Sequence, residues 1–160
     1  MKTIATKTSI NNDGNGTNGK IINPTVATVL SEVRDQLTAI ADEYLTQEEN
    51  MPENLQASCL CDELGEKAEV LQQTSDELED LVASLCEVDA DGNNNHESTT
   101  IKPVNIGDIQ VKPPRYIHGS RPKRIGRLIQ ILNVVADAVE PKNAEVAENL
   151  WGTVSELENL

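Results

Sequence analysis

The chain contains no phenylalanine, and aromatic residues make up only 2% of its 160 residues. Apolar residues reach 38%, so any core has to be built from Leu, Val, Ile and Ala. Aliphatic cores suit helix-on-helix packing, whereas deep ligand pockets are usually lined by aromatic side chains. The composition therefore disfavours a substrate-binding enzyme.

Long apolar runs and paired cysteines are also missing. The most apolar run, residues 128–139, is interrupted by Gln130, Asn133 and Asp137. It is shorter than the about 20 apolar residues that cross a bilayer. No apolar segment of the secretory kind follows the N-terminus. Three cysteines, an odd number, indicate reduced thiols. We expect a soluble, cytoplasmic protein with no membrane partner.

What the chain does have is a seven-residue hydrophobic rhythm in two stretches. Alternating steps of four and three place each set along one seam of a helix. Pro52 lies in the short polar break between them, so we predict a long antiparallel helical hairpin of the coiled-coil type. The seams are Val26, Leu30, Val33, Leu37, Ile40 and Tyr44, then Leu64, Ala68, Leu71, Ser75, Leu78, Val82 and Leu85.

Local signals predict where these helices begin. Asn23 is the expected N-cap of the first helix, with Pro24 at its first position. Ser58 is the expected N-cap of the second. Ser75 is the polar residue of the second seam. It could set the register, but we expect it to bond to the carbonyl one turn back.

A smaller helix pair is predicted at the C-terminus. Its first helix should start after Ser120, and Pro141 should end that helix and open the next. The mainly α chain then divides into four segments. They are a flexible arm (1–22), an acidic helical hairpin (23–89), an Asn-rich linker with extended segments (90–119) and a C-terminal helical hairpin (120–160).

Charge is distributed unevenly along the chain. Residues 25–89 hold 17 acidic residues against Arg34 and Lys67, a net charge of −15, while the whole chain carries −14. The candidate acidic interaction face is Glu66, Glu69, Asp76, Glu77, Glu79 and Asp80. A basic belt without any acid among its members follows the linker: Lys112, Arg115, Arg121, Lys123, Arg124 and Arg127.

The basic belt allows two interpretations. Six cations could bind the phosphates of a nucleic acid. The net charge of −14 opposes this, because its field repels another polyanion. We therefore expect the belt to pair with the acidic surface of the hairpin, and we do not expect direct nucleic-acid binding.

Sites for metals, cofactors or catalysis are poorly supported. Cys59 and Cys61 are two residues apart, which is not the usual zinc knuckle, and Cys86 adds no second pair. The segments Asp13-Gly-Asn-Gly and Asp89-Ala-Asp-Gly-Asn lack the Gly and Glu spacing of a calcium loop. No phosphate loop or nucleophile elbow is present. We predict a protein that is not an enzyme and that uses no metal or cofactor.

Part of the chain resembles a known group of proteins. The resemblance rests on Glu48-Glu49-Asn50-Met51-Pro52-Glu53-Asn54-Leu55-Gln56-x-Ser58, Gly65-Glu66-Lys67-Ala68-Glu69 and Asp76-Glu77-Leu78-Glu79-Asp80-Leu81. These runs are similar to those of small acidic helical-hairpin proteins carried by phages and conjugative elements of Gram-positive bacteria. The group has no established activity, so the resemblance implies a bacterial or phage setting, with the protein in the cytoplasm of a bacterial host cell, and no functional residues.

Three functions fit these observations. The first is a non-enzymatic protein–protein interaction module of a phage or mobile genetic element, acting through the acidic hairpin. The second is a DNA mimic that inhibits a host nuclease or another basic nucleic-acid-binding enzyme, because the net charge per unit length of the hairpin approaches that of duplex DNA. The third is a structural homo-oligomer whose seams pair between chains.

Overall fold

The computed structural model describes residues 23–86 and 105–160. The flexible arm and the Asn-rich part of the linker are predictions that fall outside these residues. The elements are α1 (Val26–Glu49), α2 (Glu53–Gln56), α3 (Cys59–Cys86), the 3-10 turn η1 (Ile106–Asp108), α4 (Arg121–Val139) and α5 (Ala144–Glu158). The part of the chain described contains no strand, only a single bridge between Thr25 and Gln110. The predicted mainly α fold is confirmed.

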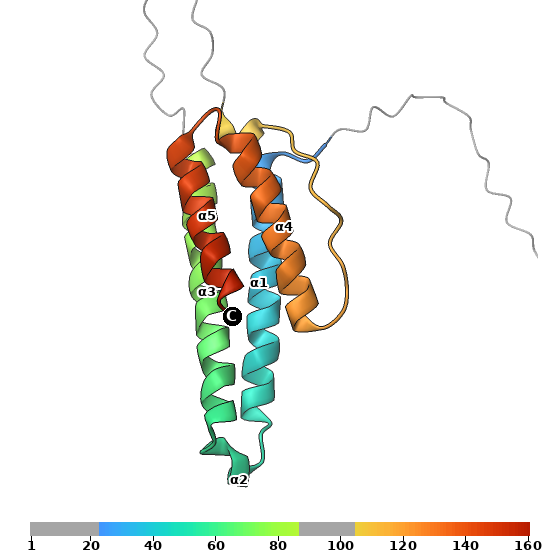
Figure 1. Ribbon diagram of the computed structural model, residues 1–160, viewed down its shortest axis with the longest axis vertical. Helices are drawn as coiled ribbons and strands as arrows, with labels where there is room; N and C mark the ends of the chain where they lie inside the picture. Colours follow the sequence, from blue (N-terminus) through green and yellow to red (C-terminus); the bar gives the residue numbers. More distant parts are fainter. Residues whose placement is uncertain (1–22, 87–104) are drawn as a thin grey trace, which may run out of the picture.

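The two long helices form the predicted hairpin. α1 and α3 run side by side over most of their length, and α2 turns the chain at one end (Figure 1). All six apolar residues of the first seam are buried. Every member of the second seam is also buried except Val82, which is half-buried. The seven-residue rhythm therefore marks the packed surface of both helices.

A second helix pair completes a four-helix arrangement. α4 packs beside α1 and α5 beside α3, and both lie next to the half of the hairpin far from α2 (Figure 1). Leu128, Leu132 and Leu150 from this pair join one core with Leu37 and Leu71 of the hairpin. The two helix pairs thus share a single hydrophobic core.

The N-terminus of α1 differs from the prediction. Its N-cap is Thr25, whose hydroxyl oxygen accepts a hydrogen bond from the Thr28 amide at 3.3 Å. Asn23 and Pro24 lie before the helix because the chain here is paired with a later segment. The Val26 amide donates to the Ile109 carbonyl at 2.8 Å, and the Val111 amide donates to the Pro24 carbonyl at 3.0 Å. This pairing keeps the backbone extended up to Thr25.

Two other end signals also act differently from the prediction. Ser58 lies directly before α3, where the start was predicted, but its hydroxyl donates to the Leu55 carbonyl and so closes the α2 turn. Pro141 does not open the last helix. The cap of α5 is Asn143, whose side-chain oxygen accepts from the Val146 amide at 3.1 Å. An Asn side chain supplies the acceptor that a free helical amide needs, and Pro cannot.

Ser75 bonds across the hairpin and not to its own helix. Its hydroxyl lies 2.8 Å from the Thr38 hydroxyl of α1 and donates to the Arg34 carbonyl at 3.4 Å. The expectation of a local bond was wrong, because α1 presents two acceptors at this level of the seam. The hydroxyl pair ties one register of α3 against α1.

Residues 109–118, here called the strap, connect η1 to α4. The strap runs along the outer side of α4 without helical structure (Figure 1). It contains Pro113 and Pro114, which have no amide hydrogen to bond to a neighbouring helix. Gly119 follows with a φ of 151°, a conformation that favours glycine, and turns the chain into α4. The expected extended segment over the helices is confirmed for this part of the linker.

Candidate interaction surfaces

The predicted acidic face lies on the outside of α3, and all six of its residues are exposed. At 100° per residue, five of them fall within about 100° of the helix circumference, opposite the seam. These five, which we call the α3 acidic face, are Glu66, Glu69, Asp76, Glu77 and Asp80. Glu79 lies on the flank nearer α1, where its carboxylate is 3.9 Å from the Arg34 guanidinium. The sixth residue is therefore not part of the same surface.

Helix α5 extends this acidic surface. A groove of about 510 Å³ runs between α3 and α5. Its lining includes four carboxylate residues, Glu77 and Asp80 from α3 and Glu148 and Glu156 from α5, and no Lys or Arg. Along the sequence α5 is far from the hairpin, so only the packing of the two helix pairs brings these groups together. We call this feature the acidic groove.

Two residues of the basic belt, Arg121 and Arg124, contact α1. Arg124 makes two hydrogen bonds to the Glu43 carboxylate of α1, and the Nη1–Oε1 distance is 2.8 Å. The Arg121 guanidinium lies 4.1 Å from the centre of the Tyr44 ring and bonds to the Gln47 side chain. These two arginines fasten the start of α4 to α1, as in the internal pairing that the sequence favoured.

Glu43 is the acidic partner of this attachment. The pKa of its carboxyl is lowered, chiefly by the hydrogen bonds from Arg124. The pKa of Arg124 is raised, chiefly by the same bonds. A lowered carboxyl pKa stabilises the folded state above the ordinary value of about 4.3, and this contribution is lost as the pH falls through the lowered value.

Replacing Glu43 by Gln should lower the free energy of unfolding by about 0.5 kcal/mol at pH 7. The effect is small because the Glu43 side chain is 48% exposed, although that of Arg124 is only 13% exposed. The difference from the parent protein should shrink below about pH 4, where the parent carboxylate also takes up a proton. Urea unfolding at pH 7 and pH 3 measures both quantities. Glu49→Gln, at an exposed carboxylate on the same helix, is the control, and an equal loss in both variants would contradict the assigned role of Glu43.

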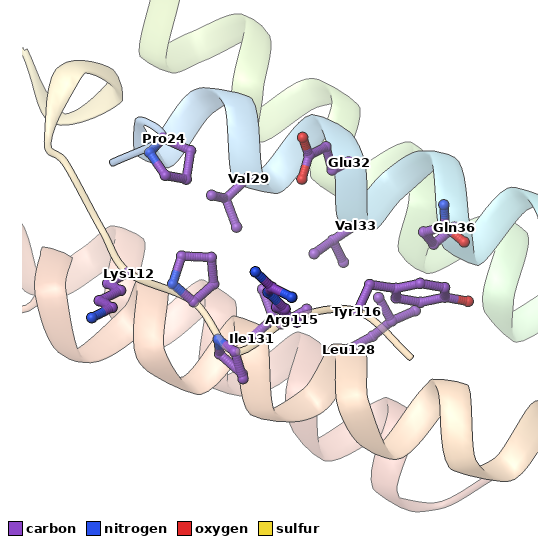
Figure 2. Close-up of a pocket in the computed structure, with 12 residues that line it drawn as sticks. Pro24, Val29, Glu32, Val33, Gln36, Lys112, Arg115, Tyr116, Leu128 and Ile131 are labelled. Atoms are coloured by element: carbon purple, nitrogen blue, oxygen red, sulfur yellow. The ribbon is translucent and has the colours of Figure 1, made fainter. Parts of the chain in front are cut away.

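The remaining four belt residues make no ion pair within residues 23–86 and 105–160. Lys112, Arg115 and Lys123 are exposed, and Arg127 is half-buried. Lys112 and Arg115 belong to the strap and stand at a cavity between the strap, α1 and α4 (Figure 2). The structure therefore does not bring the six cations together as one strip.

The cavity has a volume of about 320 Å³. Its apolar walls come from helix side chains, from prolines and from the ring of Tyr116, and its other polar residues are Glu32, Gln36, Lys112 and Arg115 (Figure 2). The sequence disfavoured a pocket because aromatic residues are scarce, yet one of the two tyrosines, Tyr116, lines this cavity. The prolines of the strap also help to form the cavity. Two successive residues without an amide hydrogen leave the strap with fewer hydrogen bonds that would hold it closely against the helices.

The cysteines remain separate from any metal-binding group. Cys59 is exposed, and Cys61 is buried with its sulfur 3.8 Å from a Glu48 carboxylate oxygen. The pKa of the Cys61 thiol is raised, chiefly by burial. Over the residues with a described structure, no group of three or more His, Cys, Asp or Glu side chains is placed to hold a metal ion. The side chain of Cys86 lies outside this description.

The chain matches no protein-family model, no curated protein and no solved structure. No helix in the described ranges is long and apolar enough to cross a bilayer. A function for the protein therefore has to come from its own surfaces. Two stand out, the acidic groove with the α3 acidic face and the cavity under the strap. The sequence indicated the first in part, through the charge of the hairpin, and gave no sign of the second.

Proposed function

We propose that this protein is a non-enzymatic interaction module that binds a basic surface of another protein. The observation that carries the proposal is the exposed acidic surface made by the α3 acidic face and the acidic groove. None of its carboxylates lies within ion-pair distance of a cation in the described structure. Uncompensated charges of one sign repel each other, and a surface of opposite charge relieves this repulsion.

The acidic groove gives this charged surface a concave shape. The lining of the acidic groove includes Leu78 and Leu81 as well as the four carboxylates. A partner with an apolar side chain flanked by Lys or Arg matches both features, because burial of the apolar group adds affinity while the charges give orientation. We further propose a phage or mobile genetic element of a Gram-positive bacterium as the setting, in keeping with the resemblance of the helical turn and its flanking helices.

DNA mimicry is the second candidate function. Helix α3 carries eight carboxylates and Lys67, a net of −7 over 28 residues. At 1.5 Å per residue this is about one charge per 6 Å, against about one per 1.7 Å in duplex DNA. The four carboxylates of α5 raise the density but do not close this gap. An ordinary basic protein surface is therefore the better match than a DNA-binding cleft.

Assembly of the protein with itself is less favoured. The seams that would pair between chains are already buried within one chain. The α3 acidic face would also meet its own copy with like charges, which is unfavourable. Leu55 and Leu60, near the α2 turn, are the large apolar residues that stay exposed within the described ranges.

Capture from a lysate tests the proposal. The full-length chain, immobilised and exposed to lysate of Gram-positive bacteria that carry mobile elements, should retain a basic protein. Sodium chloride should release it well below about 1 M, where the screening length falls to about 3 Å. Retention that persists at about 1 M salt would contradict a charge-driven contact. Competition by duplex DNA for the captured protein would favour the mimicry alternative over the ordinary basic partner.

A further inference from the structure

The cavity under the strap has the dimensions and chemistry of a small-ligand site. Its volume of about 320 Å³ lies at the lower end of the range for such sites, about 300–1,000 Å³. Val29 and Val33 of α1 face Leu128 and Ile131 of α4 across it (Figure 2). These four side chains are at most 6% exposed, and the apolar lining residues that keep exposed surface are Pro24, Pro113, Pro114 and Tyr116. An apolar body of a few carbon atoms therefore fits under the strap, against these prolines and Tyr116.

The strap adds positive charge to this apolar space. Lys112 and Arg115 line the cavity, and neither makes an ion pair with any described residue. Figure 2 shows the nitrogen end of Arg115 between the strap and α1, in the middle of the lining residues. Glu32 is the one carboxylate in the lining. The cavity thus has one more cation than it has anions.

We propose that this cavity binds a small monoanion with an apolar body, such as a short alkyl or aryl carboxylate. The apolar body would lie against Pro24, Pro113, Pro114 and Tyr116, beside the buried methyl groups of α1 and α4, where it is partly removed from water. The planar guanidinium of Arg115 can bind both oxygens of a carboxylate, and Lys112 adds a second positive charge. Glu32 makes the cavity less suited to a dianion such as phosphate.

The overall charge of −14 does not decide the charge of this ligand. The cavity lies between α1, α4 and the strap, whereas the acidic groove lies between α3 and α5 on the other side of the bundle. Electrostatic interactions at the surface are screened over about 8 Å at physiological salt. The near cations of the strap therefore weigh more than the distant carboxylates.

Octanoate is a suitable probe, titrated into the full-length protein by calorimetry and by NMR of the Val, Leu and Ile methyl groups. We expect saturable binding of one molecule, with a Kd on the order of 1 mM for a ligand of this size. Methyl signals of Val29, Val33, Leu128 and Ile131 should shift. Octan-1-ol, which has the same apolar body without the charge, should bind about tenfold more weakly, since a charged hydrogen bond is lost. Inorganic phosphate should not bind.

Two variants test the residues that the proposal names. Arg115→Gln, at an exposed position, should weaken octanoate binding about tenfold and leave octan-1-ol binding unchanged. Lys123→Gln removes an exposed belt cation that does not line the cavity and should leave both affinities unchanged. Equal octanoate affinity in the parent and Arg115→Gln would overturn the proposal, as would methyl shifts confined to residues outside the cavity. An absence of saturable binding at about 10 mM octanoate would also overturn it.

Discussion

Replacing Leu37 by Asp is expected to unfold the protein. Leu37 is 0% exposed and lies among the largest fully buried side chains of the shared core. A carboxylate there would lose its hydration, and the Ser75 hydroxyl of the facing seam is already bonded across the hairpin. The expected loss is about 4 kcal/mol or more, comparable to the whole stability of a small domain. Far-UV circular dichroism and thermal melting measure the outcome.

A matched control separates burial from the effect of a new charge on α1. Ala39 is exposed and lies two residues further along the same helix. Ala39→Asp adds the same charge and carries the helix-propensity cost of Asp, below about 1 kcal/mol. It should therefore melt close to the parent protein. If Leu37→Asp keeps the parent's helicity and melting temperature, the hairpin seam is wrongly assigned.

Reversing Glu66, Glu69, Asp76 and Glu77 to Lys should abolish capture of the partner without unfolding the protein. Each reversal changes the charge by two, so the four together take the net charge from −14 to −6. All four side chains are exposed, so the core keeps its packing. On a partner with a basic surface, four attractive contacts become repulsive, and like-charge juxtaposition costs several kcal/mol. Retention on beads and circular dichroism measure binding and folding.

The control for this variant carries the same change in net charge at other places. Asp42, Glu49, Glu53 and Asp108 are exposed and lie outside α3 and α5. Their reversal to Lys should reduce capture only slightly, because distant charges are screened. Equal loss of capture in both variants would mean that net charge alone holds the partner. Full capture by the first variant would exclude the α3 acidic face as the binding surface.

Spacing predicted the hairpin because its signal is repeated many times. Each turn of α1 contributes another seam residue, and all six residues of this seam, from Val26 to Tyr44, are buried as the rhythm requires. The second buried side of the hairpin was not predictable in this way. Val29 lies off the seam of α1 and is buried beside Leu128 and Ile131 of α4. The local pattern of one helix does not indicate which other helix will pack on its second side.

Single-residue signals were less dependable than repeated ones. Asn23 and Pro24 have the right types for a helix start, yet pairing with residues 109–111 moves the start to Thr25. Ser75 bonds to Thr38 of the other helix, a partner 37 residues away. In both cases a contact distant in sequence outweighs a local preference, and one sequence read in order cannot show such a contact.

The same limit applies to the candidate sites. The charge count pointed to α3, but the groove also needs Glu148 and Glu156 of α5. The belt was recognised as a cluster along the chain, yet Arg121 and Arg124 are used to attach α4 to α1. The cavity depends on the path of the strap over two helices. The acidic groove, the attachment of α4 to α1 and the cavity each depend on how segments distant in the sequence are placed in space.

The separation of charge across the bundle gives the molecule an electric dipole moment. Carboxylates gather on α3 and α5, and uncompensated cations of the strap lie beside α1 and α4 on the other side. In the field of a positively charged body, such a dipole turns the protein so that α3 and α5 approach first. More collisions then begin in a productive orientation, which raises the rate of association more than the final affinity.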